Sequence, residues 1–292
     1  MRSYLFVPAD SARKFDKAMT CGADALIIDL EDSIAPERKA DARHGAAALL
    51  REAVPRTARP RLFVRINGLD SGLADDDLDV VVAARPDGIW LPKAEGGQAV
   101  IHLDAKLAAR EAVHGLPDGH VRVVAIATET AKAMFLAGTY AGASPRLAGL
   151  TWGAEDLSAE LGAEANRDDD GRFLDPSRLA RALCLAAAAA AEVQPIDTVT
   201  IDFRNADALR RECREARRDG FTGKMAIHPA QVPIINEVFT PTAEAIGRAR
   251  AIVDAFARAP GAGVVGVGGV MYDRPHLARA RRLLAQAGAT TA

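Results

Sequence analysis

The chain has 292 residues and a mass of 30.8 kDa; 49% of its residues are hydrophobic and 26% are charged. The 37 lysines and arginines nearly balance the 39 aspartates and glutamates, which leaves a formal net charge of −2. This balance gives no support for a nucleic acid or an anionic membrane surface as partner, so we expect small-molecule partners and other subunits. The length suits one α/β domain with a large core.

The cysteines and the N-terminus predict a cytoplasmic protein. Cys21, Cys184 and Cys213 show no CxxC spacing and are expected to be reduced thiols. The N-terminal apolar run is too short for a signal peptide, and no stretch has the length of a membrane span. The alanine-rich stretch 183–193 is expected to be a buried helix.

Apolar runs alternate with segments of helical periodicity along the first 229 residues. Eight strands are predicted at 3–8, 25–31, 61–67, 88–93, 121–129, 147–156, 198–202 and 223–229. Seven helices are predicted between them, at 11–21, 36–52, 73–84, 97–113, 131–143, 175–192 and 205–219. This alternation favours an α/β fold of the (β/α)8 barrel type, a TIM barrel, over an open doubly wound sheet.

The pattern changes after the eighth predicted strand. Residues 229–259 are expected to be helical, residues 260–269 to be a mobile glycine-rich connector, and residues 270–287 to be a short extended piece followed by a basic amphipathic helix. We therefore assign a catalytic barrel to residues 1–259 and a connector with a C-terminal helical extension to residues 260–292. The connector contains a GxGxxG spacing, but it follows a helix, so we do not interpret it as a dinucleotide site.

Three predicted strands end at or near a charged residue. The runs 121–129 and 147–156 end in Glu129 and Asp156, and Arg65 lies near the end of the run 61–67. Because the carboxyl ends of barrel strands share one face, these side chains are expected to form one polar site. Two carboxylates and one guanidinium suggest a divalent metal and an anionic substrate. The alternative is a structural ion-pair cluster that closes the barrel mouth.

The sequence DLEDS adds further carboxylates near the same face. Strand alternation would place Asp29 and Glu31 on one side of the strand and Asp32 on the other. We interpret Glu31 or Asp32 as the residue that orients Arg65 and a metal-bound water, with a surface role as the alternative.

Two more residues have both a functional and a structural interpretation. Lys93 ends another predicted strand, where it would contact substrate or only balance the acidic charge. His228 precedes a proline, so it is either structural or part of a substrate channel. His276 is expected only to pack at a helix N-terminus.

A family resemblance rests on seven motifs that follow one another along nearly the whole chain. They are RSYLFVPAD, ALIIDLEDSIAPERKADAR, RLFVRIN, GIWLPKAE, IATETA, LTWGAEDLSAELGA and GKMAIHPAQV. Together they resemble the citrate lyase beta subunit family and its relatives in the HpcH/HpaI aldolase superfamily, the malyl-CoA and citramalyl-CoA lyases. The resemblance implies a (β/α)8 barrel, a homotrimer or hexamer, and Mg²⁺-dependent carbon–carbon cleavage of a 3-hydroxyacyl thioester.

The resemblance also implies roles for individual residues. Glu129 and Asp156 would bind Mg²⁺, and Arg65 would hold the carboxylate of the 2-oxo acid. These residue types suit the reaction, because negative charge develops on oxygen when the hydroxyl proton is lost and again when the thioester enolate forms. Magnesium prefers oxygen ligands and keeps positions open for water and substrate, and arginine offers a carboxylate a planar fork.

Two further roles follow from the same resemblance. The backbone of Gly153, Ala154 and Glu155 would lie against the substrate, which a glycine without Cβ permits. Asp273, in the motif MYDRPH, would be a catalytic acid or base from a neighbouring subunit, on which the C-terminal segment would pack. It is the candidate for the proton that the enolate needs.

The C-terminal segment favours a free CoA ester, because related proteins with this extension act on CoA thioesters. We therefore expect malyl-CoA or citramalyl-CoA to be cleaved to acetyl-CoA and a 2-oxo acid, glyoxylate or pyruvate. Alternatives are a citrate lyase beta subunit, whose substrate is held by an acyl-carrier protein, and a malyl-CoA thioesterase. An inactive barrel used for binding or assembly would predict a broken metal pair or a missing arginine, and the sequence shows neither.

Overall fold

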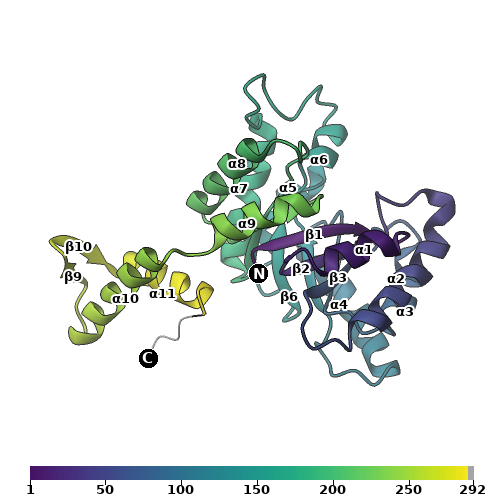
Figure 1. Ribbon diagram of the computed structural model, residues 1–292, viewed down its shortest axis with the longest axis horizontal. Coiled ribbons are helices and arrows are strands. Elements are labelled where there is room, and N and C mark those ends of the chain that lie inside the picture. Colours follow the sequence, from purple (N-terminus) through teal and green to yellow (C-terminus); the bar gives the residue numbers. More distant parts are fainter. Residues whose placement is uncertain (289–292) are drawn as a thin grey trace. The chain divides into compact units, whose positions relative to one another are not determined.

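The computed structural model describes residues 1–288 and contains a closed barrel of eight parallel strands in chain order (Figure 1). The strands are β1 (Ser3–Pro8), β2 (Ala25–Asp29), β3 (Arg61–Arg65), β4 (Gly88–Leu91), β5 (Arg122–Ile126), β6 (Leu147–Thr151), β7 (Gln194–Asp197) and β8 (Gly223–Ala226). The pairing of β1 with β8 closes the barrel. The predicted fold class is confirmed.

Helices follow the strands. They are α1 (Ala12–Met19), α2 (Lys39–Ala53), α3 (Ala74–Val82), α4 (Gly97–Val113), α5 (Ala131–Leu136), α6 (Ala154–Glu160), α7 (Asp175–Ala190), α8 (Ala206–Asp219) and α9 (Val232–Phe239), with short 3₁₀ turns at Pro36–Arg38, Ala137–Thr139 and Pro229–Gln231. All seven predicted helices are present. Among the described residues 1–288, no helix combines the length and the apolar character that crossing a membrane requires.

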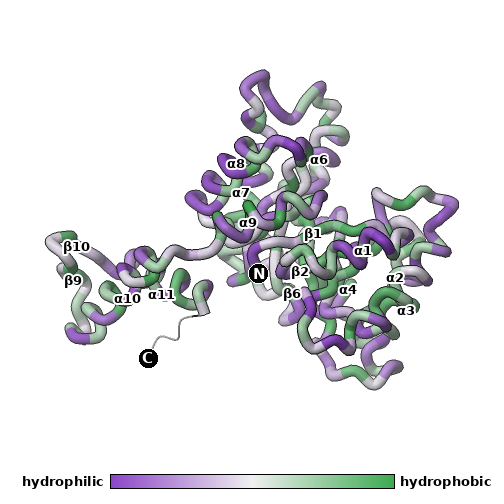
Figure 2. Tube along the Cα trace, in the orientation of Figure 1, coloured by the Kyte–Doolittle hydropathy of each residue, from purple (hydrophilic) through white to green (hydrophobic). Residues whose placement is uncertain are grey.

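Aromatic and aliphatic side chains fill the barrel interior. Tyr4 and Trp90 lie with ring centroids 5.2 Å apart, and Phe63 meets Trp90 edge to face at 5.9 Å. Figure 2 shows the contrast between the hydrophobic barrel strands and the hydrophilic helix α8. The interior is therefore a packed core, which leaves the loops after the strands to form the site.

The seventh predicted strand, 198–202, is wrong, because β7 occupies Gln194–Asp197 instead. Pro195 argues against a strand by sequence, since it has no N–H to donate. In the structure its carbonyl still accepts a hydrogen bond from the Thr222 N–H at 3.1 Å, so a strand of only four residues tolerates it.

The predicted strand 147–156 is also two elements rather than one. β6 ends at Thr151, and Gly153 precedes the helix α6. Asp156 therefore lies in the first turn of a helix, where the positive end of the helix dipole favours a carboxylate.

The chain divides into two compact units, Met1–Asn236 and Glu237–Ala292. The boundary falls earlier than the expected 259, because α10 (Ala243–Arg258) packs against α11 (Arg274–Gln286) and not as part of the barrel unit. Ile252 and Phe256 of α10 share a core with Leu277 and Leu284 of α11.

Part of the predicted connector 260–269 is a hairpin. β9 (Val264–Val267) pairs antiparallel with β10 (Val270–Asp273). The two-residue turn between them, Gly268 and Gly269, has positive φ at both positions (58° and 78°), the geometry that glycine pairs supply in hairpins. The predicted extended piece and basic helix of residues 270–287 are confirmed as β10 and α11.

Candidate active site

A cavity of about 700 Å³ lies in the barrel unit, lined largely by residues that end or follow strands. Its walls include most of the predicted site residues: Asp32, Arg65, Glu129, Gly153, Ala154, Glu155, Asp156 and His228. They come from the loops after β2, β5, β6 and β8, from the first turn of α6 and from the end of β3. The structure thus brings together side chains that are up to 196 residues apart in the chain, from Asp32 to His228.

Arg65 is the centre of an ion-pair cluster in this cavity. Its Nε and Nη2 both donate to Asp29, to Oδ1 and Oδ2 at 2.7 Å each. Its Nη1 donates to Asp32 Oδ2 at 3.0 Å and lies 2.9 Å from Glu31 Oε2, without the alignment of a hydrogen bond. The ring of Phe6 covers the guanidinium, with Cζ 4.9 Å from the ring centroid.

These contacts agree with the expectation that Glu31 or Asp32 orients Arg65, and they add Asp29 as a further partner. The main partner of Arg65 is Asp29, and both Glu31 and Asp32 also contact the guanidinium. The expected alternation, with Asp29 and Glu31 on one side of a strand and Asp32 on the other, does not apply. The strand β2 ends at Asp29, so Glu31 and Asp32 lie in a loop. Burial alone would raise the pKa of Asp29, but the hydrogen bonds and the charge of Arg65 outweigh it and hold that pKa below its ordinary value.

Glu31 and Lys93 form an ion pair at the edge of the cluster. Lys93 Nζ lies 2.5 Å from Glu31 Oε1 and 3.6 Å from Asp156 Oδ1. Both residues line a second cavity, of about 710 Å³, rather than the first. Burial raises the pKa of Glu31 despite the two cations beside it.

Glu129 is buried, with only 2% of its surface exposed. Its Oε2 accepts a hydrogen bond from the backbone N–H of Lys93 at 2.5 Å, and Lys93 adopts a left-handed backbone conformation (φ 49°). Such a conformation is costly for a residue with a side chain, and strain of this kind often accompanies a functional site. Burial and then the negative charge of Asp156 raise the pKa of Glu129 to about 8.

The donor set at Glu129 and Asp156 suits a hard divalent cation. Two carboxylates face one cavity; Lys93 Nζ lies 3.6 Å from Asp156 Oδ1, and the charge of Asp156 adds to burial in raising the pKa of Glu129. Within residues 1–288, no three His, Cys, Asp or Glu side chains are grouped so that they could hold a metal ion. A cation here would complete its shell with water or substrate oxygens, as Mg²⁺ commonly does.

The predicted backbone segment after β6 lies in the cavity wall, as expected. A Cβ on Gly153 would lie 3.2 Å from Glu129 Cγ and 3.4 Å from Oε1, so the glycine allows the backbone to approach this carboxylate closely. The side chain of Glu155 accepts a hydrogen bond from Asn166 Nδ2 at 2.6 Å.

His228 lines the cavity and also has a structural role. Its Nδ1 accepts a hydrogen bond from the Ala230 N–H at 3.2 Å, and its ring stacks on Phe203 with centroids 4.6 Å apart. Both interpretations of His228 therefore stay open.

Sequence reasoning missed two aromatic contributors, Phe6 and Trp152, which line the same cavity. Trp152 is fully buried, and its Nε1 donates to Asp197 Oδ1 at 2.9 Å. The position of Trp152 directly before Gly153 was the sequence feature that could have identified it as part of the cavity wall. Phe6 gave no comparable signal, because alternating aromatic residues in a strand are typical of a core.

Asp273 belongs to the second unit, where it precedes α11. Its carboxylate accepts a hydrogen bond from the His276 N–H and contacts His276 Nδ1, and this hydrogen bonding lowers the pKa of Asp273. His276 thus packs at a helix N-terminus, as predicted.

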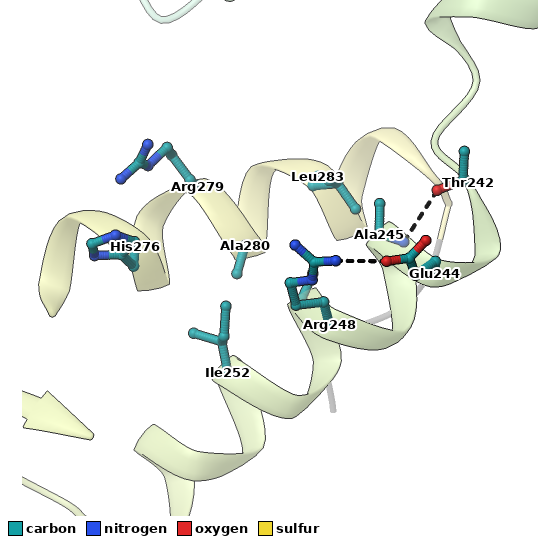
Figure 3. Close-up of a pocket in the computed structure, with 10 residues that line it drawn as sticks. Thr242, Glu244, Ala245, Arg248, Ile252, His276, Arg279, Ala280 and Leu283 are labelled. Carbon is teal, nitrogen blue, oxygen red and sulfur yellow. Dashed lines mark hydrogen bonds and ion pairs between the residues drawn. The ribbon is translucent and has the colours of Figure 1, made fainter. Parts of the chain in front are cut away.

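The second unit has a pocket of its own between α10 and α11 (Figure 3). Its volume is about 330 Å³. Arg248, which pairs with Glu244 at 2.6 Å, and Arg279 line it beside the apolar side chain of Ile252.

Curated relatives cover the whole chain. A (3S)-malyl-CoA thioesterase from Cereibacter sphaeroides is 37% identical over 100% of this chain and 96% of its own length. The citrate lyase subunit beta of Escherichia coli is 35% identical over 98% of this chain and 93% of its own length.

Solved structures agree with these relatives. The protein CitE from Mycobacterium tuberculosis, in complex with magnesium, acetoacetate and coenzyme A, matches with a TM-score of 0.77 and 32% identity over 98% of each chain. RipC from Yersinia pestis matches with a TM-score of 0.67 and 33% identity over 84% of this chain and 98% of its own. Residues 2–229 match the family model described as HpcH/HpaI aldolase/citrate lyase. On this evidence of sequence and fold, the chain belongs to the HpcH/HpaI aldolase/citrate lyase family.

Proposed function

We propose that this protein is a Mg²⁺-dependent CoA-ester lyase that cleaves malyl-CoA or citramalyl-CoA to acetyl-CoA and glyoxylate or pyruvate. The observation that carries the proposal is the buried Glu129, with its raised pKa, facing the same cavity as Asp156 and Arg65. The CitE structure with magnesium, acetoacetate and coenzyme A supports the ligand class.

The arginine side of the cavity, formed by Arg65 and Asp29, would bind the carboxylate in the 2-oxo acid part of the substrate. Asp29 takes Nε and one proton of Nη2, and Asp32 takes one proton of Nη1, so Arg65 keeps one N–H on each Nη atom that can bind a carboxylate. Because Asp29 fixes the plane of the guanidinium, a bound carboxylate would be oriented without further loss of side-chain freedom.

The carboxylate side would hold the metal through Glu129 and Asp156. A bound divalent cation would supply positive charge to the oxygens on which negative charge develops. Lys93, which pairs with Glu31 and lies 3.6 Å from Asp156, would lie beside the metal site. The backbone at Gly153 and Ala154 would lie along the thioester.

A thioesterase is the second candidate, because the Cereibacter sphaeroides relative carries that name at 37% identity over the whole chain. The two activities share the thioester and differ in the bond that breaks, carbon–carbon or carbon–sulfur. An inactive barrel is disfavoured, since Arg65, Glu129 and Asp156 are all present in one cavity.

A panel of purified acyl-CoA thioesters with Mg²⁺ distinguishes these candidates, if 2-oxo acid, acetyl-CoA and free CoA are measured separately. The lyase predicts equal amounts of 2-oxo acid and acetyl-CoA and no free CoA. Free CoA without acetyl-CoA would identify a thioesterase, and no product from any thioester would reject both enzymes.

The role of Asp273 can be tested by mixing two inactive variants. We propose that Asp273 is a catalytic acid or base in the site of a neighbouring subunit of a trimer or hexamer, which would also place water-excluding residues over the site. Asp273→Asn and Arg65→Ala should each be nearly inactive, while a mixture with demonstrated subunit exchange should regain activity from sites that carry both wild-type residues. No recovery after exchange would reject a shared site.

A further inference from the structure

Lys39, the first residue of α2, donates three hydrogen bonds beneath the site. Its Nζ lies 2.8 Å from the carbonyl oxygen of Leu30, 2.7 Å from that of Glu31 and 2.7 Å from Asn67 Oδ1. All three partners are neutral, and they fill the donor capacity of an ammonium group. Lys39 thus connects the turn after β2 with the turn after β3.

Lys39 lies at a helix position where a positively charged side chain is normally unfavourable. A cation in the first turn of a helix meets the positive end of the helix dipole, which is unfavourable. A residue that violates local preference while making three short hydrogen bonds is expected to serve the tertiary structure or the site.

Asn67 is held from its other side as well. Its backbone N–H and Nδ2 donate to Asp77 Oδ2 at 2.9 and 2.7 Å, and Asp77 Oδ1 accepts from Arg43 Nε at 2.8 Å. Arg43 is four residues after Lys39 on α2, so the two cations lie on one face of that helix. Lys39, Asn67, Asp77 and Arg43 form a clamp, which we call the α2 clamp.

The turn between β2 and α2 is fixed from two sides. Asp29 accepts hydrogen bonds from the N–H groups of Glu31 (3.0 Å) and Ser33 (3.2 Å), while it also holds Arg65. Lys39 satisfies the carbonyl groups of the same turn. Without Lys39, the hydrogen bonds that Asp29 accepts from the N–H groups of this turn would remain. The carbonyl of Leu30 would lose its bond to the ammonium group.

We propose that Lys39 is a positioning residue for the site: through the α2 clamp it fixes the turn after β2, and with it the position of Glu31 against Arg65 and Lys93. This inference rests on the proposed function, since it assigns the turn to 2-oxo acid binding. Lys39 does not line the cavity and would not touch the substrate.

The test compares Lys39→Met with Lys106→Met. Lys106 of α4 also holds a partner from another element, Asp75 of α3 at 2.8 Å, but it contacts neither the turn after β2 nor the turn after β3. Binding of glyoxylate and pyruvate is measured by calorimetry with Mg²⁺, binding of acetyl-CoA is measured in parallel, and hydrogen exchange is followed in peptides covering residues 29–35.

We expect Lys39→Met to weaken 2-oxo acid binding at least about tenfold, to change acetyl-CoA binding by less than about twofold, and to speed exchange only in residues 29–35. Lys106→Met should change none of these. Lys39→Arg, which keeps the charge and several donors, should bind the 2-oxo acid more tightly than Lys39→Met. If Lys39→Met does not fold, Lys39→Gln replaces it in the same comparison.

A second comparison tests the clamp itself. Because Lys39 and Asn67 act through one shared hydrogen bond, the double variant Lys39→Met/Asn67→Leu should bind 2-oxo acid no more than about threefold more weakly than the worse single variant. If the loss of 2-oxo acid affinity in the double variant equals the product of the two single losses, the α2 clamp is rejected. It is also rejected if Lys39→Met binds 2-oxo acid and exchanges hydrogen as wild type does. If wild type binds no 2-oxo acid and cleaves no thioester, the proposed function fails, while exchange in residues 29–35 still decides whether Lys39 fixes the turn.

Discussion

The arginine side of the cavity, around Arg65, and the carboxylate side, around Glu129 and Asp156, differ in how their charges are balanced. On one side, Arg65 is surrounded by Asp29, Glu31 and Asp32, and two of its nitrogens are committed to Asp29 at 2.7 Å. On the other side, Glu129 has one backbone hydrogen bond, from Lys93, and the carboxylate of Asp156 nearby.

The pKa shifts express this difference. Asp29 is held below its ordinary pKa by Arg65, so it is ionised and stabilised in the folded protein. Glu129 is raised to about 8 by burial and by Asp156, so its negative charge lacks compensation. On the arginine side the guanidinium charge is already balanced by carboxylates of the protein, whereas on the carboxylate side a bound cation would favour the ionised form of Glu129.

The largest effect is expected from breaking the carboxylate side. Glu129→Gln or Asp156→Asn removes one of two anionic ligands, and EDTA should have the same effect on wild type. Because a metal contributes several kcal/mol of charge stabilisation, turnover should fall about 10³-fold or more in the thioester assay. Glu52→Gln, on the exposed face of α2 and paired with Arg56, is the control and should stay active. Full activity of metal-free wild type would contradict this assignment.

The arginine side predicts a smaller, ligand-specific effect. Arg65→Lys keeps the charge but loses the planar fork, and hydrogen bonds to charged groups contribute about 1.5–3 kcal/mol. The KM for the 2-oxo acid in the condensation direction should therefore rise roughly 10- to 100-fold, with the KM for acetyl-CoA nearly unchanged. Arg59→Lys provides a matched control, because Arg59 pairs with Asp87 near the opposite end of β3. An unchanged KM for the 2-oxo acid would assign Arg65 to structure alone.

Much of this fold could be predicted because strand periodicity and chain order are local signals. The barrel follows from eight apolar runs, and the expectation that Glu129, Asp156 and Arg65 share a cavity follows from the common face of parallel strand ends. The errors occurred where one residue changes the backbone. Pro195 concealed β7, and Gly153 divides the run that was predicted to be one strand.

The sequence predicts which residues form the site, but it does not predict which of them form ion pairs with one another. Glu31 and Asp32 were the candidates for orienting Arg65, whereas Asp29, which makes the bidentate contact, was expected only to lie near the same face. That pairing depends on the end of β2 and the loop after it, which no periodicity describes. Lys39 had no functional signal, because a lysine at the start of a helix is ordinary until its three acceptors are known.

The two sides should also give opposite pH dependences of stability. Glu129 has an ordinary pKa of 4.5 and a folded pKa of about 8, so the folded protein holds more protons than the unfolded chain between these values. The free energy of unfolding of the metal-free protein should then fall as the pH rises from about 5 to 8, by up to about 1.4 kcal/mol per pH unit. Asp29, with its lowered pKa, contributes stability above its ordinary pKa and loses it only in acid.

Urea unfolding in EDTA at a series of pH values measures this slope. Glu129→Gln should remove the decline between pH 5 and 8, because no carboxyl group then titrates at that position. Saturating Mg²⁺ should also reduce it, since a bound cation favours the ionised form. The same decline in Glu129→Gln as in wild type would show that another group causes it.

The smallest predicted effect concerns the spacing between the β6–α6 turn and Glu129. In Gly153→Ala, the new Cβ would lie 3.2 Å from Glu129 Cγ, so the side chain must shift by a few tenths of an ångström. Overpacking of this kind costs about 1 kcal/mol, which should weaken Mg²⁺ binding by calorimetry about fivefold. Arg65 lies on the other side of the cavity, so 2-oxo acid binding should weaken only through the metal. Gly138→Ala is the control, because a Cβ at Gly138 meets no atom within 4 Å. Equal Mg²⁺ affinity in both variants would mean that the metal does not depend on the position of Glu129, and the carboxylate side would then lose its assignment.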